Sequence, residues 1–187
     1  MIQNPLVKVN VPKVKKRILP SHTPEQVEYL IEQAETLRDK RIVSLFADSG
    51  MRLSELTSIK PPHIDWQNRL ITVWGKGGKQ RKAPFTERTA RLLREYASQN
   101  CAGENVWRLN TWGVVSVLRR LEQKTGLPCN AHTFRRTFAS NLHRAGLDVE
   151  HIMRLGGWES LDMVLRYTRS VRFEESLKLY KEISLNK

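Results

Sequence analysis

The sequence predicts a mainly helical α+β domain that carries one small antiparallel β-sheet. Three observations support this prediction. Apolar residues recur with helical spacing over most of the chain. Between residues 63 and 85, short segments rich in β-forming residues flank the glycine-rich stretch 75–79, which is typical of a hairpin. The 187 residues, 40% of them hydrophobic, are enough to bury the core of one domain.

The first segment, residues 1–18, lacks a helical period. It mixes Val and Lys with two prolines, a composition that suits an extended arm running over a surface. We therefore expect residues 1–18 to form a linker at a domain junction and residues 19–187 to form the domain itself.

A first helix is predicted to begin at Pro24. Thr23 is a suitable N-cap, proline fits the first helical position, and Gln26 completes a capping box with Thr23. The apolar residues that follow share one helical face: Val27, Leu30, Ile31 and Ala34.

The other elements are predicted from apolar spacing and from the positions of glycine and proline. Before residue 86 we expect helices at 41–49 and 52–59 and strands at 63–66, 69–74 and 80–85. After residue 86 we expect helices at 87–98, 111–125, 133–144, 149–155, 161–167 and 173–183. The helix at 41–49 ends at Gly50, so Arg52 should lie just beyond a glycine turn.

The composition favours a polyanionic partner. Lys and Arg number 32 against 19 Asp and Glu, which gives a formal net charge of +13 at pH 7 and a pI near 10.1. Because cations that neutralise phosphates release counterions, nucleic acid is the first candidate. Charge alone fits a basic structural protein equally well, so the motifs must decide.

The sequence argues against a membrane or secreted protein and against a disulfide-rich or zinc-binding one. No segment approaches the roughly 20 apolar residues that cross a bilayer, and the first residues lack the apolar core of a signal peptide. We therefore expect a cytoplasmic protein without a membrane partner. Cys101 and Cys129 lie in unrelated segments without CxxC spacing, so we interpret both as free thiols rather than as parts of a disulfide framework or zinc site.

One candidate anion site is the pair His132 and Arg135, one turn apart near the start of a helix. A phosphate would suit an imidazole and a guanidinium that converge there. The same spacing recurs in His151 and Arg154, so the pair by itself is a weak signal. The alternative is a capped helix with a solvated arginine.

Two further cationic residues are candidates. Arg52 is followed one turn later by Glu55, which can orient its guanidinium through a charge-assisted hydrogen bond. Lys76 lies in the glycine-rich turn, where a mobile ammonium can reach a substrate oxygen. Considered separately, the first is usually a surface ion pair and the second a solvated hairpin lysine.

Near the C-terminal end, a glycine turn precedes the indole donor Trp158, and Tyr167 follows among basic residues. Both aromatic residues would also fit a core. A tyrosine hydroxyl has a pKa of about 10, so as a nucleophile it needs a base or an electropositive site. Arg166, Arg169 and the motifs above can supply that site.

Taken in order, these motifs resemble the active-site pattern of the tyrosine recombinase, or phage integrase, family. The residues that carry the resemblance are Arg52, Glu55, Lys76, His132, Arg135, Trp158 and Tyr167. It extends from about Leu19 to the C-terminal end and implies the catalytic-domain fold of that family. It also implies a site-specific recombinase or integrase that acts on double-stranded DNA without a metal or nucleotide cofactor.

The resemblance implies a role for each residue. Tyr167 would attack the scissile phosphate and leave a 3′-phosphotyrosine, while Arg52 and Arg135 would stabilise charge on the nonbridging oxygens. Lys76 would be the general acid for the leaving oxygen, with Lys79 and Lys82 as alternatives. The remaining roles are those of His132 as acid/base partner near the tyrosine, Trp158 as a hydrogen-bond donor and Glu55 as a supporting residue.

The chain departs from the family pattern in two ways. Many members have histidine at the position of Trp158, and an indole donates a hydrogen bond but transfers no proton at neutral pH. Full-length members also carry an N-terminal helical domain that clamps DNA, so we expect this chain to be a piece of a longer protein.

The helix at 173–183 resembles the C-terminal helix by which family members associate into a tetramer on DNA. On one helical face it carries Phe173, Leu177, Leu179 and Tyr180. Packing of that helix on its own domain is the alternative. For the whole chain, the competing functions are a type IB topoisomerase, which shares this chemistry, and a DNA-binding regulator without catalysis.

Overall fold

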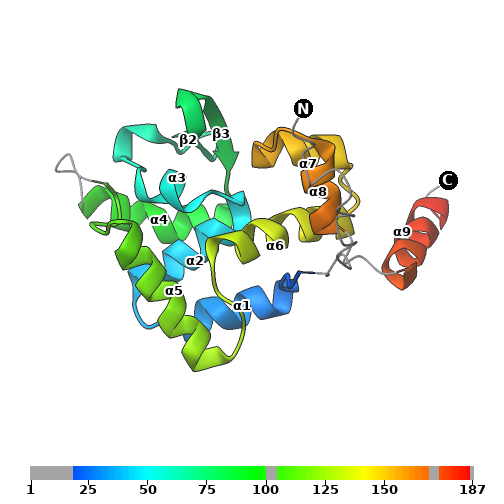
Figure 1. Cartoon of the computed structure of the whole chain (residues 1–187), viewed down its shortest axis with the longest axis horizontal. Coiled ribbons are helices and arrows are strands. Elements are labelled where there is room, and N and C mark those ends of the chain that lie inside the picture. Colours follow the sequence, from blue (N-terminus) through cyan, green and yellow to red (C-terminus); the bar gives the residue numbers. More distant parts are fainter. Residues whose placement is uncertain (1–18, 100–104, 169–172, 186–187) are drawn as a thin grey trace, which may run out of the picture.

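The computed structural model describes residues 19–99, 105–168 and 173–185. Its helices are α1 (Pro24–Gln33), α2 (Leu37–Ser49), α3 (Leu53–Thr57), α4 (Glu87–Gln99), α5 (Thr111–Thr125), α6 (Ala131–Arg144), α7 (Val149–Gly156), α8 (Leu161–Thr168) and α9 (Phe173–Leu185). The strands are β1 (Ile64–Asp65), β2 (Leu70–Trp74) and β3 (Gln80–Pro84), and two 3-10 turns are η2 (Pro61–His63) and η3 (Lys76–Gly78). The predicted mainly helical α+β fold is confirmed (Figure 1). The predicted linker, residues 1–18, lies outside the described residues.

The sheet is antiparallel, in the order β1-β2-β3. Val73 on β2 is opposite Arg81 on β3, and Ile71 is opposite Ala83. Because side chains alternate along a strand, these four residues share one face, on which Ile71, Val73 and Ala83 are buried. Arg81 is therefore directed toward the interior of the protein, behind the turn that contains Lys76.

The hydrophobic core consists of two clusters joined by α6. The larger cluster includes residues of α1 to α5 and of the sheet, together with Phe134 at the start of α6. The smaller one includes Phe138 of the same helix together with residues of α7 and α8 and with Trp158. One turn of α6 therefore lies between the clusters, and this turn carries Arg135.

Most predicted elements are confirmed, and the differences lie at the ends of helices and strands; the predicted strand 63–66, for example, is reduced to Ile64–Asp65, because His63 belongs to the 3-10 turn η2. Helix α2 begins at Leu37, before the expected residue 41, because the Thr36 side chain accepts the backbone N–H of Asp39 (3.1 Å) and caps it there. Helix α6 begins at Ala131 rather than 133, capped by Asn130. Helix α3 ends at Thr57, two residues before the expected end.

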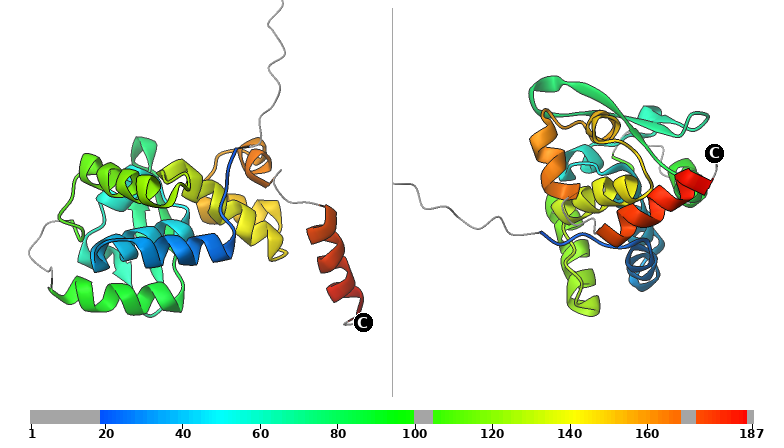
Figure 2. Two further views of the ribbon diagram at one scale, coloured as in Figure 1. Left: turned by 90° about the horizontal axis from the view of Figure 1, so that it is seen from below. Right: turned by 90° about the vertical axis from the view of Figure 1, so that its right-hand side faces the viewer.

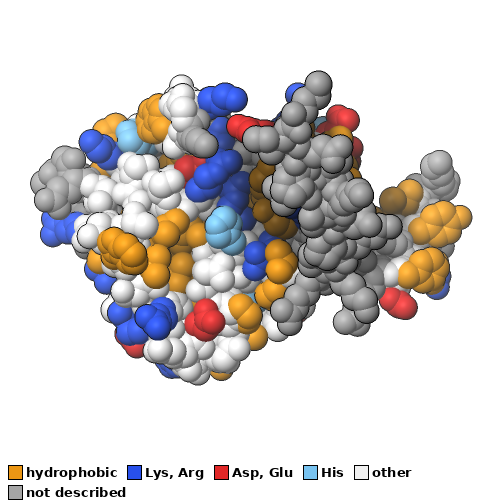
Figure 3. All heavy atoms as spheres, in the orientation of Figure 1, with side chains coloured by type: hydrophobic (Ala, Val, Ile, Leu, Met, Phe, Trp, Pro, Cys, Tyr) orange, Lys and Arg blue, Asp and Glu red, His pale blue; other side chains and the backbone are white. Residues whose placement is uncertain are grey.

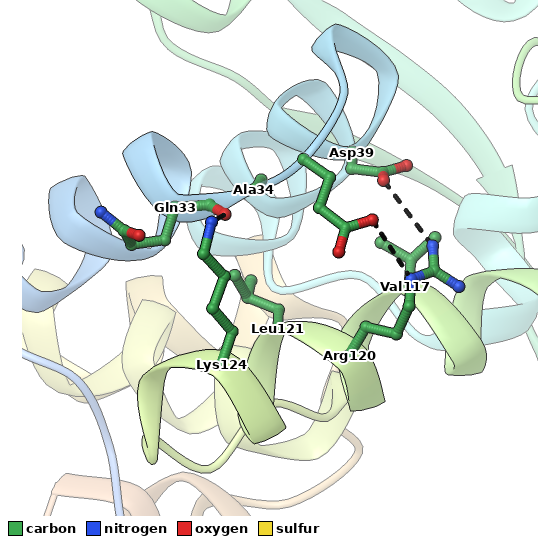
Figure 4. Close-up of a pocket in the computed structure, with 8 residues that line it drawn as sticks. Gln33, Ala34, Asp39, Val117, Arg120, Leu121 and Lys124 are labelled. Carbon is green, nitrogen blue, oxygen red and sulfur yellow. Dashed lines mark hydrogen bonds and ion pairs between the residues drawn. The ribbon is translucent and has the colours of Figure 1, made fainter.

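Helix α5 is fastened to α1 and α2 by its charged side chains (Figure 4). Arg120 pairs with Glu35 at 3.4 Å and with Asp39 at 3.9 Å, and the Lys124 ammonium donates to the Gln33 carbonyl at 2.8 Å. The other face of α5 is thus held toward α3 and the start of α6. None of the helices in the described part is both long and apolar enough to span a membrane.

Candidate active site

A cleft of about 760 Å³ collects most of the residues singled out from the sequence. Those that line it are Arg52, His132, Arg135, Trp158 and Tyr167. They come from the start of α3, the first turns of α6, the turn after α7, and α8. Figure 3 shows Lys and Arg side chains running down the middle of one face of the molecule, beside a histidine and an apolar area.

Arg52 is the N-cap of α3 and is about one-third exposed, while Glu55 one turn later is fully buried. The Arg52 guanidinium donates to Glu55 Oε1 at 2.8 Å, and its backbone N–H donates to Glu55 Oε2 at 2.9 Å. A second guanidinium nitrogen of Arg52 donates to the Gly157 carbonyl at 3.2 Å. The predicted Arg52–Glu55 pair is therefore a fixed, partly buried unit rather than a loose surface pair.

Arg135 is 4% exposed and lies in the wall of the cleft. Its guanidinium donates to the carbonyls of Gly50 and Gly156, and its Cζ lies 4.6 Å from the centre of the Trp158 ring. Burial, together with the positive charge of Arg52, lowers the pKa of Arg135 to about 10. This side chain is thus a charged donor in a low-dielectric environment, where an incoming anion would be bound strongly.

Two glycines are required at the end of α7. A Cβ on Gly156 would lie 1.8 Å from the Trp158 ring, and a Cβ on Gly157 would lie 2.4 Å from Cδ of Arg81. Gly157 also has φ +63°, which a residue with a side chain rarely adopts. The glycine turn recognised in the sequence is therefore what lets an indole and an arginine approach the helix end.

Trp158 has an unsatisfied polar atom. The indole Nε1 is buried and has no hydrogen-bond partner among the described residues. Buried N–H groups without a partner are rare, because each costs free energy on desolvation. A ligand oxygen in the cleft would satisfy it, as expected for a donor to phosphate.

Tyr167 lies near the end of α8 and is partly exposed in the cleft. Its ring centre is 5.6 Å from that of Trp158, and its carbonyl accepts the Ser140 hydroxyl of α6 at 2.7 Å. The ring is therefore held beside the end of α7, whose carbonyls accept from the arginines, and the backbone is tied to α6, which carries Arg135.

The side chain of the candidate His132 lies in the described part of the structure, whereas that of the candidate Lys76 does not. His132 is exposed on the first turn of α6 and lines the cleft. Lys76 lies in the 3-10 turn between β2 and β3, but its side chain lies outside the described part of the structure. Of the alternatives, Lys79 is exposed and pairs with Glu159 at 3.7 Å, and Lys82 is on the outward face of β3.

The second HxxR pair does not line the cleft. His151 is exposed on α7 and its Nδ1 lies 3.0 Å from Oδ1 of Asp148, the N-cap of that helix. Arg154 is also exposed. This pair matches the alternative interpretation, a capped helix with a solvated arginine.

Arg81 is a site residue that the sequence analysis missed. It lies behind the cleft wall with 12% of its side chain exposed and donates to both oxygens of Glu55. The available signal was its strand position, two residues from the buried Ala83, which predicts an inward side chain.

One of the two cysteines lies in the described part of the structure. Cys129 is a buried free cysteine beside the cleft, and burial raises the pKa of its thiol to about 12. Cys101 lies outside the described residues. Among the described residues, no group of three or more His, Cys, Asp or Glu side chains is placed to hold a metal ion.

Comparison with known proteins identifies similar sequences and folds. Residues 21–173 match the model of the phage integrase family. The chain is 30% identical to the tyrosine recombinase XerA of Saccharolobus solfataricus over 169 residues, which cover 90% of this chain and 58% of that protein. It is 32% identical to the tyrosine recombinase XerC of Chlamydia muridarum over 200 residues, covering 97% and 62%.

Solved structures show the same fold. A crystal structure of a XerA recombinase aligns with a TM-score of 0.78 at 24% identity, covering 89% of this chain and 65% of that one. XerH bound to its difH substrate in a post-cleavage complex aligns with a TM-score of 0.69 at 20% identity, covering 90% and 53%. The chain spans about three fifths of the length of the curated relatives it matches first.

Proposed function

The chain belongs to the phage integrase family of tyrosine recombinases, and from this premise we propose that it is the catalytic domain of a site-specific DNA recombinase. The proposed domain is residues 19–187, with residues 1–18 as its linker. The observation that carries the proposal is the cleft in which Tyr167 faces the same space as Arg52 and Arg135. A nucleophile beside two buried or partly buried arginines suits an attack on a phosphodiester.

The reaction is a transesterification. The Tyr167 hydroxyl oxygen attacks the phosphorus, its proton passes to His132, and the bond from phosphorus to the 5′ oxygen breaks. Lys76 gives a proton to the leaving 5′ oxygen. The product is a 3′-phosphotyrosine and a free 5′-hydroxyl, so the energy of the phosphodiester is kept for rejoining to another strand.

Arg52 and Arg135 provide charge where the transition state develops it. Their guanidinium groups are already oriented by Glu55 and by the carbonyls of Gly50, Gly156 and Gly157. Little reorganisation is then needed when the nonbridging oxygens gain negative charge. Trp158 supplies the third donor through Nε1, which has no partner among the residues that the structure describes.

Double-stranded DNA is the proposed substrate. The net charge of +13 and the basic cleft support binding to the phosphate backbone, which releases counterions and weakens with salt. Related proteins of this fold have been solved with DNA bound, among them XerH with difH. Because a protein of this kind works on chromosomal or mobile DNA, we place it in the cytoplasm on DNA.

The test is covalent capture of DNA by Tyr167. A library of nicked duplexes with a randomised centre is incubated with the protein, and DNA that stays attached in detergent is recovered and sequenced. The wild-type chain should enrich one class of duplex, and the attached peptide should contain Tyr167 by mass spectrometry. Tyr167→Phe should give no adduct while retaining DNA binding in a gel-shift assay.

Three results would overturn the proposal or its details. An undiminished adduct in Tyr167→Phe would remove the mechanism, because the nucleophile would lie elsewhere. Relaxation of supercoiled plasmid without any exchange of strands between two duplexes would favour the type IB topoisomerase instead. DNA binding with no adduct on any duplex would favour the regulator without catalysis.

Helix α9 is the proposed contact for assembly on DNA. It stands apart from the rest of the domain (Figures 1 and 2), tied to α6 by the ion pair of Arg144 with Glu175 at 2.9 Å. Phe173 and Tyr180 on it are 74% and 67% exposed. A helix with exposed apolar side chains is suited to docking on a second copy, and the resemblance to the family implies a tetramer.

Self-association is tested on the recovered duplex. Phe173→Ser combined with Tyr180→Ser should abolish the higher-order protein–DNA complexes in light scattering while leaving single-site binding and strand cleavage in place. Trp112→Ser is the matched control, since Trp112 is 78% exposed on α5. Unchanged assembly in the double variant would show that α9 is not the contact.

A further inference from the structure

Glu55 is shared by two arginines on opposite sides. Its Oε1 accepts from Arg52 at 2.8 Å and from Arg81 Nε at 3.3 Å, and its Oε2 accepts from Arg81 Nη2 at 2.7 Å. Arg52 faces the cleft, whereas Arg81 lies behind it on the inward face of β3. The carboxylate is 0% exposed, so water does not screen its charge.

This arrangement determines the charge that a phosphate would meet. The three guanidinium groups of Arg52, Arg81 and Arg135 and the single carboxylate of Glu55 together carry two positive charges. Without Arg81 the same group would carry one, and the buried carboxylate would be compensated by Arg52 alone. A phosphodiester has one negative charge, and the transition state for attack on it gathers further charge on the same oxygens.

We propose that Arg81 is a positioning residue that neutralises Glu55 and thereby leaves the charges of Arg52 and Arg135 available to the scissile phosphate. The inference rests on the proposed function, and it concerns a residue that lies outside the cleft lining. Arg81 acts through Glu55, not by touching the substrate.

A second contact fixes the position of Arg81. Its Nη1 donates to the Leu155 carbonyl at 2.9 Å, and the next two carbonyls, of Gly156 and Gly157, accept from Arg135 and Arg52 at 3.2 Å each. Three arginines thus bind three successive carbonyls at the end of α7. Arg81 makes these contacts from three separate nitrogens of one planar group, a fork that the single ammonium nitrogen of lysine does not offer.

The experiment compares two forms of the cleavable duplex recovered above. One has an ordinary phosphodiester at the scissile position, and the other has a methylphosphonate there, in which a neutral methyl group replaces one charged oxygen. Arg81→Gln should slow single-turnover cleavage of the phosphodiester by roughly 10- to 100-fold. On the methylphosphonate the loss should be less than about threefold, because its transition state carries one negative charge fewer.

Two control variants separate charge from folding. In a Glu55→Gln background, Arg81→Gln should add little further loss, since no buried carboxylate remains to be neutralised. Arg41→Gln is the matched control, because Arg41 is also a buried arginine but packs on α4, donating to the Leu92 carbonyl and stacking over Tyr96. Its effect should be the same on both substrates.

Equal slowing of both substrates by Arg81→Gln would overturn the inference and leave Arg81 as a structural residue. The inference also fails if Arg81→Gln costs as much in the Glu55→Gln background as in the wild type. If Arg81→Gln does not fold, the pair Glu55→Gln with Arg81→Gln, compared with Glu55→Gln alone, still gives the answer. Failure of the wild-type chain to form a Tyr167 adduct would instead refute the proposed function.

Discussion

Replacing Gly157 by alanine tests whether the end of α7 depends on close contact with Arg81. The free-energy change has two parts. First, Gly157 has φ +63°, where a side chain costs roughly 1–2 kcal/mol. Second, the new Cβ would lie 2.4 Å from Cδ and 2.9 Å from Nε of Arg81. Arg81 cannot simply swing away, because Glu55 and the Leu155 carbonyl hold its guanidinium.

Gly126 provides a control with the same backbone strain. It is the C-cap of α5 as Gly157 is of α7, it has φ +71°, and a Cβ there would have no neighbour within 4 Å. Overpacking of a fixed neighbour typically costs about 1–3 kcal/mol. Gly157→Ala should therefore lower the free energy of unfolding by about 1–3 kcal/mol more than Gly126→Ala does.

Urea denaturation followed by circular dichroism measures both free energies of unfolding. Gly157→Ala should also slow Tyr167 adduct formation, since moving Arg81 disturbs Glu55 and with it Arg52, whereas Gly126→Ala should not. Equal destabilisation by the two alanines would refute the reasoning, because it would mean that Arg81 relaxes at no cost and that only backbone strain matters.

Two more outcomes are expected. Arg135→Ala should slow adduct formation by roughly 10²- to 10³-fold, because the site loses a preorganised donor. Arg154→Ala, on the exposed face of α7, should change the rate less than about threefold. The reverse order in single-turnover rates would mean that His151 and Arg154 form the functional HxxR pair. Burial raises the pKa of Glu55, but the hydrogen bonds and charges of Arg81 and Arg52 outweigh it and hold that pKa below the ordinary 4.5. The ionised carboxylate thus contributes stability above pH 4.5 that is lost as the pH falls through the lowered pKa, and Glu55→Gln should flatten this acid limb in urea titrations.

The course of the chain was predictable because most helix ends carry a local signal. Thr23 with Gln26 forms the expected capping box, and α5 has the expected bounds. The start of α2 was missed because the sequence between 34 and 40 has few apolar residues to mark a period, while the cap at Thr36 is one hydroxyl on one backbone N–H. A single capping hydrogen bond is a weak sequence signal but is enough to set where a helix begins.

The residues that face the cleft could be predicted, and the contact that supports them from behind could not. Arg52, Arg135 and Tyr167 belong to motifs whose order along the chain carries information. Arg81 has no motif of its own, and its partner Glu55 is 26 residues away in the chain. Only the antiparallel register, which sets Arg81 opposite Val73, turns its side chain toward that carboxylate.

The end of α7 explains why these separate motifs act as one site. Helical carbonyls at a C-terminus have no partner in the helix and carry partial negative charge, so they attract cations. Here each of the last carbonyls, from Leu155 to Gly157, accepts from a different arginine, one from β3, one from α6 and one from the start of α3. Two of those arginines face the cleft and the third balances Glu55. The same helix end turns through Gly157 directly into Trp158, so the segment that orients the arginines also positions the indole beside them. The Nε1 of this indole has no partner in the described part of the chain.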